Sequence, residues 1–143
     1  MGKQSLLFGL QGRITRAPWW IGNIGITIIT ILIAFFAMAT SPYLLVVILI
    51  FVYAGFALSL KRAHDRDRPD WYVIVPYLLS LLSSVARFTM ISSAPEATPG
   101  TSELLLFAVD IVVSIWGLVL LIDLGFLRGT RGPNRYGPDP LET

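Results

Sequence analysis

The residues that could do chemistry lie mostly in one short charged segment. Residues 61–71 read Lys-Arg-Ala-His-Asp-Arg-Asp-Arg-Pro-Asp-Trp and contain the only histidine of the chain. His64 beside Asp65 supplies a titratable base and an orienting acid. Neighbouring residues seldom face each other, however, and no serine, cysteine or set of metal ligands completes a catalytic site. A basic cluster at the level of lipid headgroups more naturally attracts anionic lipid.

The same segment also has a purely structural interpretation. Lys and Arg in loops set the orientation of membrane helices, and alternating charges form charge-assisted hydrogen bonds with helix ends. Two interpretations therefore stand side by side, a structural or topogenic role and a site for a ligand or partner. The candidate binding residues of this segment are Arg62, His64, Asp65, Arg66 and Arg68.

The C-terminal tail is rich in turn-forming residues. Residues 131–140 read Arg-Gly-Pro-Asn-Arg-Tyr-Gly-Pro-Asp-Pro, a composition that specifies turns and neither helix nor strand. A solvated, disordered tail is one interpretation. The other is a docked tail, because the Tyr136 ring lies between tight turns, and Asn134, Arg135 and Tyr136 are its candidate contact residues.

Two opposite charges fall inside apolar stretches, far from the charged segment. Arg87 lies in an apolar stretch at residues 71–91 and Asp110 in another at 104–127, at similar depths in the membrane. An unpaired charge at such a depth costs about 2.5 kcal/mol or more. We expect an Arg87–Asp110 ion pair, with Glu103 as a competing partner. The pair either fixes helix register or forms a polar site that binds or moves something. Asp123 lies on another face and can meet the charged segment at the membrane surface.

These residues must be positioned by membrane-spanning helices. Hydrophobic residues make up 55% of the 143 positions and charged residues 14%, against about a quarter charged in soluble domains. Four stretches have the roughly 20 apolar residues that a span needs. We predict an all-α membrane protein, a single domain over 1–143, with four transmembrane helices in an antiparallel bundle. The predicted spans are residues 19–38, 42–60, 71–91 and 104–127, followed by a tail at 128–143.

The basic residues indicate the orientation. Ten of the eleven Lys and Arg residues precede the first span, separate the second from the third, or follow the fourth. Because basic loops stay in the cytoplasm, both termini are expected there, in the bacterial cytoplasmic (inner) membrane. Residues 5–14 form either a short interfacial helix or an irregular lead-in.

Small and weakly polar residues recur on one face of each predicted span. Asn23, Thr27 and Thr30 share a face of the first span, and Pro76 and Ser80 share a face of the third. Helices in lipid associate through such residues. Each helix therefore has one face suited to contact within a bundle.

Several classes of site are excluded by residue counts. The chain has no cysteine and one histidine, so a disulfide framework, an iron–sulfur cluster and a metal centre with several histidines within one chain are ruled out. No basic run with interleaved aromatic residues indicates nucleic-acid binding. We expect no cofactor, no metal site and no nucleic-acid partner.

Three segments together resemble a known family. The matching parts are Gly12-Arg13-Ile14-Thr15-Arg16 with Trp19, residues 61–66 with Arg68 and Trp71, and Gly132 with residues 134–140. The chain resembles the small bacterial inner-membrane family known as domain of unknown function 805. The resemblance implies a four-helix membrane protein with its motifs on the cytoplasmic side, and it implies no activity.

Since all three motifs fall on the predicted cytoplasmic side, we expect them to assemble into one surface. Its residues are Arg13, Arg16, Arg62, His64, Asp65, Arg66, Arg68, Asn134, Arg135 and Tyr136. The favoured role is a non-catalytic module that binds anionic membrane lipid or a protein partner there. The alternatives are a small transporter or channel, necessarily a homo-oligomer, and a membrane enzyme acting on a lipid phosphate through His64.

Overall fold

The computed structural model describes residues 7–40, 45–93 and 100–142, and most of these residues are helical. The helices are α1 (Arg16–Ala39), α2 (Leu45–Asp65), α3 (Trp71–Ser93) and α4 (Thr101–Leu120). A π-helical segment, η2 (Leu121–Phe126), continues α4 without a break. No strand occurs in the described ranges, so the predicted all-α class is confirmed.

Each helix is long and apolar enough to cross a membrane. The qualifying segments are Arg16–Ala37, Val46–Asp65, Trp71–Met90 and Thr101–Phe126. Large apolar side chains such as Ile21, Phe35, Leu82 and Phe107 are exposed along them. In a membrane this outward apolar surface would face lipid. The prediction of four helices long and apolar enough to span a membrane is confirmed.

The helix bounds differ from the predicted ones mainly in α2. The sequence ended the second span at residue 60, but α2 continues through Lys61 to Asp65. The extra turn carries charged side chains, and it is stable as helix because other segments bury and pair those charges, as described below. The predicted start at residue 42 lies outside the described residues.

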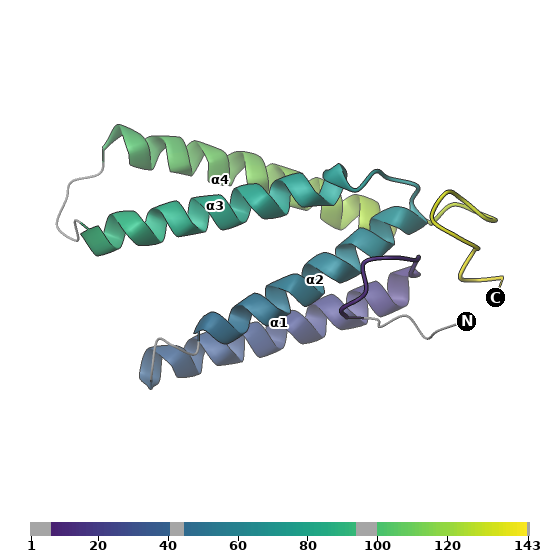
Figure 1. The fold of residues 1–143 in the computed structure, drawn as a ribbon, viewed down its shortest axis with the longest axis horizontal. Helices are drawn as coiled ribbons and strands as arrows, with labels where there is room; N and C mark the ends of the chain where they lie inside the picture. Colours follow the sequence, from purple (N-terminus) through teal and green to yellow (C-terminus); the bar gives the residue numbers. More distant parts are fainter. Residues whose placement is uncertain (1–6, 41–44, 94–99, 143) are drawn as a thin grey trace.

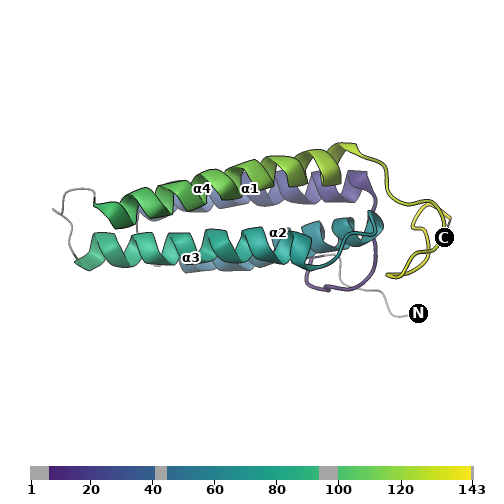
Figure 2. The ribbon, with the colours of Figure 1, turned by 90° about the horizontal axis from the view of Figure 1, so that it is seen from above.

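The helices form two antiparallel hairpins that diverge from one end. α1 packs against α2, and α3 packs against α4. The hairpins meet where α2 contacts α3 and where η2 contacts α1 and α2. Figure 1 shows them separating with distance from the end that holds both termini. Figure 2 shows α4 over α1 and α3 over α2, so the two hairpins face each other.

The polar helix faces line the space between the hairpins. A cavity of about 630 Å³ has Asn23, Thr27 and Thr30 on one side and Pro76 and Ser80 on the other. A cavity of about 410 Å³ adjoins it nearer the joined end and shares Asn23 and Thr27 with it. The faces that the sequence assigned to bundle contacts therefore point toward each other across a cleft.

The buried apolar core lies at the joined end. It contains Ile14, Trp19, Leu58, Leu60, Ala63, Val73, Leu120 and Leu124. These residues come from the N-terminal segment, from α1, α2, α3 and α4, and from η2. The core thus fixes the relative positions of all the elements at this end and of none at the other.

The N-terminal lead-in is irregular where it is described. Residues 7–15 form turns and extended backbone and not a helix, and Gly12 adopts a positive φ of 92°. The interfacial helix expected as one alternative for residues 5–14 is therefore absent from residues 7–14. Residues 5 and 6 lie outside the described part of the chain.

Candidate functional site

Three segments far apart in the sequence converge at the joined end of the helices. They are the lead-in at residues 7–15, the α2–α3 connection at 66–70, and the tail at 127–142. Both termini and the α2–α3 connection lie at this end in Figure 1. We call these three segments, together with the start of α1, the last turn of α2 and η2, the basic end, because they carry every described Lys and Arg except Arg87. It contains all ten residues that the sequence proposed for a binding surface.

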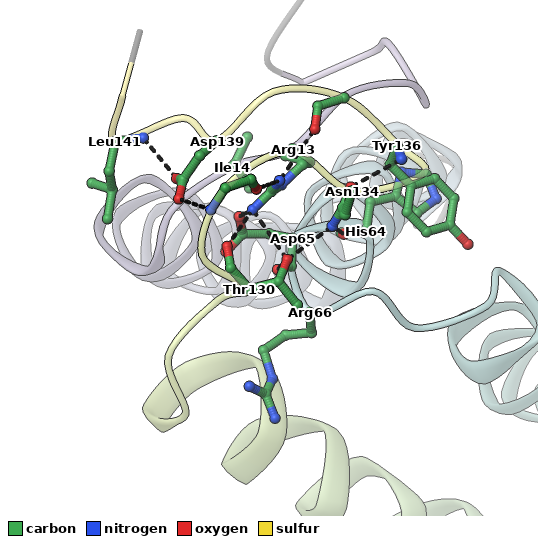
Figure 3. A network of polar contacts seen from close by, with 12 residues as sticks. Arg13, Ile14, His64, Asp65, Arg66, Thr130, Asn134, Tyr136, Asp139 and Leu141 are labelled. Carbon is green, nitrogen blue, oxygen red and sulfur yellow. Dashed lines mark hydrogen bonds and ion pairs between the residues drawn. The ribbon is translucent and has the colours of Figure 1, made fainter.

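Arg13 fastens the lead-in to both α2 and the tail (Figure 3). Its Nε donates to Asp65 Oδ1 at 3.1 Å. Its Nη1 donates to the carbonyl oxygens of Gly132 at 2.8 Å and Gly137 at 3.2 Å, and its Nη2 donates to that of Thr130 at 2.7 Å. The side chain is only 1% exposed. A guanidinium has five N–H donors, and Arg13 uses its donors for hydrogen bonds within the protein.

Arg62 caps the end of the last membrane span. Its Nε donates to the Leu124 carbonyl at 2.8 Å, and its Nη2 donates to the Leu127 carbonyl at 2.6 Å. The last carbonyls of a helix have no partner within the helix, and a cation is favourable at that end. Arg62 is 1% exposed, so it supplies these carbonyl oxygens with hydrogen-bond donors at a place that is shielded from water.

Two side chains of α1 complete the cap. Trp20 Nε1 donates to the Gly125 carbonyl at 3.0 Å, and Arg16 Nη1 donates to the Phe126 carbonyl at 3.0 Å. A Cβ at Gly125 would lie 2.8 Å from the Trp20 ring, so the close approach of α1 to η2 requires glycine there. The end of η2 is thereby bonded to the start of α1 and to the end of α2.

Asp65 is the anionic centre of the network. It accepts from Arg13 and forms an ion pair with Arg62, and it is 3% exposed. The Thr130 backbone N–H donates to the Asp65 carbonyl at 2.8 Å. A Cβ at Gly129 would overlap the Asp65 carboxylate. Only glycine lets the tail pass so close to α2.

His64 holds the lead-in, the α2–α3 connection and the tail at once. Its Nδ1 is 3.1 Å from the Gly12 carbonyl, and its Nε2 is 2.9 Å from Asp70 Oδ1. Its ring stacks on the Tyr136 ring with centroids 3.9 Å apart. A carbonyl and a carboxylate are both acceptors, so both contacts are hydrogen bonds only when both ring nitrogens carry protons.

Arg66 and Arg68 bind a carboxylate of the last span. Arg66 Nη2 is 2.9 Å from Asp123 Oδ1, and Arg68 Nε is 3.2 Å from Asp123 Oδ2. Asp123 lies in η2 and is 4% exposed. The hydrogen bond to Asp123 raises the pKa of Arg68 above its ordinary value. Figure 3 shows Arg66 pointing away from the Arg13 cluster, so Asp123 and Asp65 mark two separate centres of charge.

The tail is folded against this end. Asn134 Nδ2 donates to the His64 carbonyl at 2.8 Å, and Tyr136 Oη donates to the Arg68 carbonyl at 2.9 Å. Arg135 forms an ion pair with Asp67 at 3.0 Å. Gly137, with φ at 137°, forms a reciprocal backbone bridge with Asn134. Of the two interpretations of the tail, the structure has the docked one over residues 127–142.

Asp139 closes the tail turn. Its carboxylate accepts the backbone N–H of Leu141 and of Gly132, each at 3.0 Å. These two hydrogen bonds hold the pKa of Asp139 below its ordinary value, with help from the charges of Arg13 and Arg128. Gly132 has a φ of 71°, a conformation that glycine adopts without strain.

The expected surface thus divides into an inner and an outer set. Arg13, Arg62, His64 and Asp65 are enclosed in the network, so they do not present a surface to a ligand. Arg16, Arg68, Arg135 and the remaining members are exposed or half-buried. The sequence missed Thr130, Gly129 and Asp139 as parts of the network. The signal that could have pointed to them is the turn-rich composition of the tail, which indicates a segment with a fixed backbone shape.

The second pair of candidate residues lies near the other end of the helices. Arg87 and Asp110 form an ion pair between α3 and α4, with side chains 37% and 43% exposed. Ser83 Oγ donates to Asp110 Oδ1 at 2.6 Å. The pair joins α3 to α4, the two helices of one hairpin.

Comparison with known proteins gives a family and no activity. The family model described as "Protein of unknown function (DUF805)" matches residues 7–138. Two similar proteins, both named "Uncharacterized protein YiiR", come from Escherichia coli K12 and Escherichia coli O157:H7. Each is 30% identical over 144 residues, covering 95% of this chain and 88% of the relative. No solved structure matches the chain significantly. The match includes the lead-in, the charged segment and the tail that build the basic end, and the chain belongs to the DUF805 family of proteins of unknown function.

Proposed function

We propose that the protein is a non-catalytic module of the bacterial cytoplasmic membrane whose basic end binds anionic lipid headgroups. In this proposal both termini lie in the cytoplasm, because the basic end carries almost all of the Lys and Arg residues. The cytoplasmic leaflet is also the one that carries a negative surface potential. A basic end in contact with that leaflet meets the lipids it would bind.

The observation that carries the proposal is how the arginines are used. Arg13 and Arg62 are buried and bonded within the protein. Arg128 and Arg131 are exposed, and within the described residues neither forms an ion pair. Arg16 is exposed as well, and its side chain donates to the Phe126 carbonyl and not to a carboxylate. These three arginines therefore keep positive charge available for a partner.

The three exposed arginines lie at the ends of the predicted spans, at the level where lipid headgroups are expected. Arg16 begins the first span, and the last span ends at Phe126, two residues before Arg128. A basic residue near an anionic membrane surface contributes about 1 kcal/mol of attraction. The three arginines supply such attraction without breaking a contact of the folded protein.

The test is native mass spectrometry of the full chain released from detergent. Phosphatidylglycerol or phosphatidylcholine is added to the micelles at matched concentrations. We expect bound phosphatidylglycerol in excess of phosphatidylcholine, and loss of that excess in the triple variant Arg16→Gln, Arg128→Gln, Arg131→Gln. Equal retention of the two lipids by the unaltered protein would overturn the proposal.

A matched control is available in Arg135→Gln, which removes one positive charge at the same end. Arg135 is held by Asp67 and is not among the three proposed binding residues. The same spectra give the subunit number, so they also detect a homo-oligomer or a retained protein partner. An enzyme-tag reporter fused to the C-terminus, active only in the cytoplasm, tests the orientation.

A small oligomeric transporter is the second candidate, favoured by the cleft between the hairpins. Asn23, Thr27 and Ser80 place polar groups along a cavity of about 630 Å³ within the spans. Solute flux into proteoliposomes that the variant Asn23→Leu abolishes would favour this candidate over the first. An enzyme acting on a lipid phosphate through His64 is supported less, because both ring nitrogens already hold structural partners.

A further inference from the structure

A small, strongly basic cavity opens at the basic end between the start of α1 and the tail. Its volume is about 170 Å³, and its lining includes Arg16, Arg62, Arg128 and Arg131 together with Asp65 and Asp139. The four arginines come from three segments that the fold brings together. A cavity of this size holds a phosphate group and not a larger charged surface.

The two carboxylates of the lining are already satisfied. Asp65 is paired with Arg13 and Arg62, and Asp139 accepts two backbone N–H groups. Arg62 forms an ion pair with Asp65 and donates hydrogen bonds to carbonyls at the end of η2. Asp139 keeps its negative charge, which the charges of Arg13 and Arg128 favour. Four arginines stand against two aspartates in the lining, so the cavity has an excess of positive charge.

The start of α1 adds to this excess. Thr15 precedes the first turn and lines the cavity, its side chain makes no capping hydrogen bond, and the first turn contains no acidic residue. The first amides of a helix lack partners within the helix and carry a partial positive charge. The three arginines carry the inference, and the open helix start points the same way.

We propose that this cavity is a phosphate site, in which Arg16, Arg128 and Arg131 hold the phosphate oxygens of an anionic lipid. Guanidinium groups match phosphate with paired hydrogen bonds, and the Thr15 hydroxyl is a further donor to an oxygen. The lipid is favoured over a free phosphate because the cavity lies where the first span begins and the last one ends. This inference rests on the proposed lipid-binding function and makes it specific, since it replaces general charge attraction with one built site.

The experiment compares charge removed inside the cavity with charge removed outside it. Full-length protein in detergent is titrated with phosphatidic acid and followed by native mass spectrometry. We expect Arg128→Gln and Arg131→Gln each to weaken binding about tenfold, the value for one lost charge-assisted hydrogen bond. Arg135→Gln should change it by less than about twofold, because exposed charges at a distance are screened. Arg128 and Arg131 are exposed, so unfolding temperatures should show that both variants fold.

The outcomes separate this inference from the proposed function. If Arg135→Gln weakens binding as much as the cavity variants do, the phosphate site is overturned and general lipid attraction stands. If the unaltered protein retains no anionic lipid, both are overturned. Inorganic phosphate is the competing arm: a protein that binds phosphate but not phosphatidic acid overturns the assignment to lipid. Retained phosphatidic acid that millimolar phosphate does not displace supports it.

Discussion

The two ends of the helices use the same kind of charge pair for different purposes. At the basic end, Asp65 is 3% exposed and is shared between Arg13 and Arg62. Near the other end, Arg87 and Asp110 are 37% and 43% exposed and pair within one hairpin. The first set joins the lead-in, α2 and the tail, whereas the second joins only two neighbouring helices. The pairs at the basic end therefore hold distant segments together, whereas the Arg87–Asp110 pair holds two neighbouring helices together.

The difference follows from what surrounds each charge. Burying an ion pair costs several kcal/mol per ion unless hydrogen bonds satisfy the remaining donors and acceptors. At the basic end, carbonyls of the tail and of the end of η2 meet that need for Arg13 and Arg62. Near the other end, Ser83 supplies a hydrogen bond to Asp110, and both charged side chains remain partly exposed. The hairpins are consequently joined at one end and separate at the other.

The strongest test of this comparison is Arg62→Met. The substitution keeps much of the apolar stem and removes the charge, which leaves Asp65 with one cationic partner and the Leu124 and Leu127 carbonyls without donors. Removing one partner of a buried pair costs about 3–5 kcal/mol. We expect a loss of that size in the free energy of unfolding, measured by denaturant titration in detergent micelles.

Arg135→Gln serves as the reference for this measurement. Its ion pair with Asp67 is about half exposed on both sides, and exposed pairs contribute about 0–1 kcal/mol. Equal losses for Arg62→Met and Arg135→Gln would contradict the view that burial separates the two kinds of pair.

The next largest effect is expected from reversing the Arg87–Asp110 pair. Arg87→Asp and Asp110→Arg each leave two like charges facing each other within the spans, so each should lower the unfolding temperature. The double variant restores opposite charges and should recover most of the loss. The losses should be smaller than that of Arg62→Met, because the side chains are partly exposed. A double variant no better than either single one would show that these residues do not act as a pair.

The smallest effect concerns the pH dependence of the docked tail. The pKa of Asp139 is lowered in the folded protein by the backbone N–H groups of Leu141 and Gly132. Its stabilising contribution is therefore complete above the ordinary aspartate value of about 3.9 and is lost as pH falls through the lowered folded value. Unfolding temperatures of the natural protein and of Asp139→Asn should differ by a constant amount from pH 7 to about pH 5 and converge below about pH 4. A gap that stays constant into strong acid would contradict a role for the carboxylate.

Much of the fold could be predicted from local sequence. Residues 19–38 and 71–91 were predicted as spans, and the helices are Arg16–Ala39 and Trp71–Ser93. Apolar length and composition are properties of each stretch alone, so they can be read without knowing its neighbours. The end of α2 was predicted five residues too early, because Lys61 to Asp65 appear as loop until their distant partners are known.

The candidate site could be located but not resolved from the sequence. The motifs around Arg13, His64 and Tyr136 were assigned to one end of the molecule, and they do meet there. The sequence treated them as one surface, however, and did not distinguish Arg62, which is 1% exposed, from Arg131, which is exposed. Both are arginines beside turn-forming or polar residues, and nothing local separates them.

The sequence by itself determined the four apolar spans and the gathering of positive charge at one end, because hydrophobic length and charge are additive along the chain. Only the tertiary structure decided which of those charges are paired within the protein and which stay exposed. Arg13 meets Gly132 across 119 positions, and Arg62 meets Leu124 across 62. The role of a charge depends on its partners and its exposure, and at the basic end both come from segments that only folding brings together.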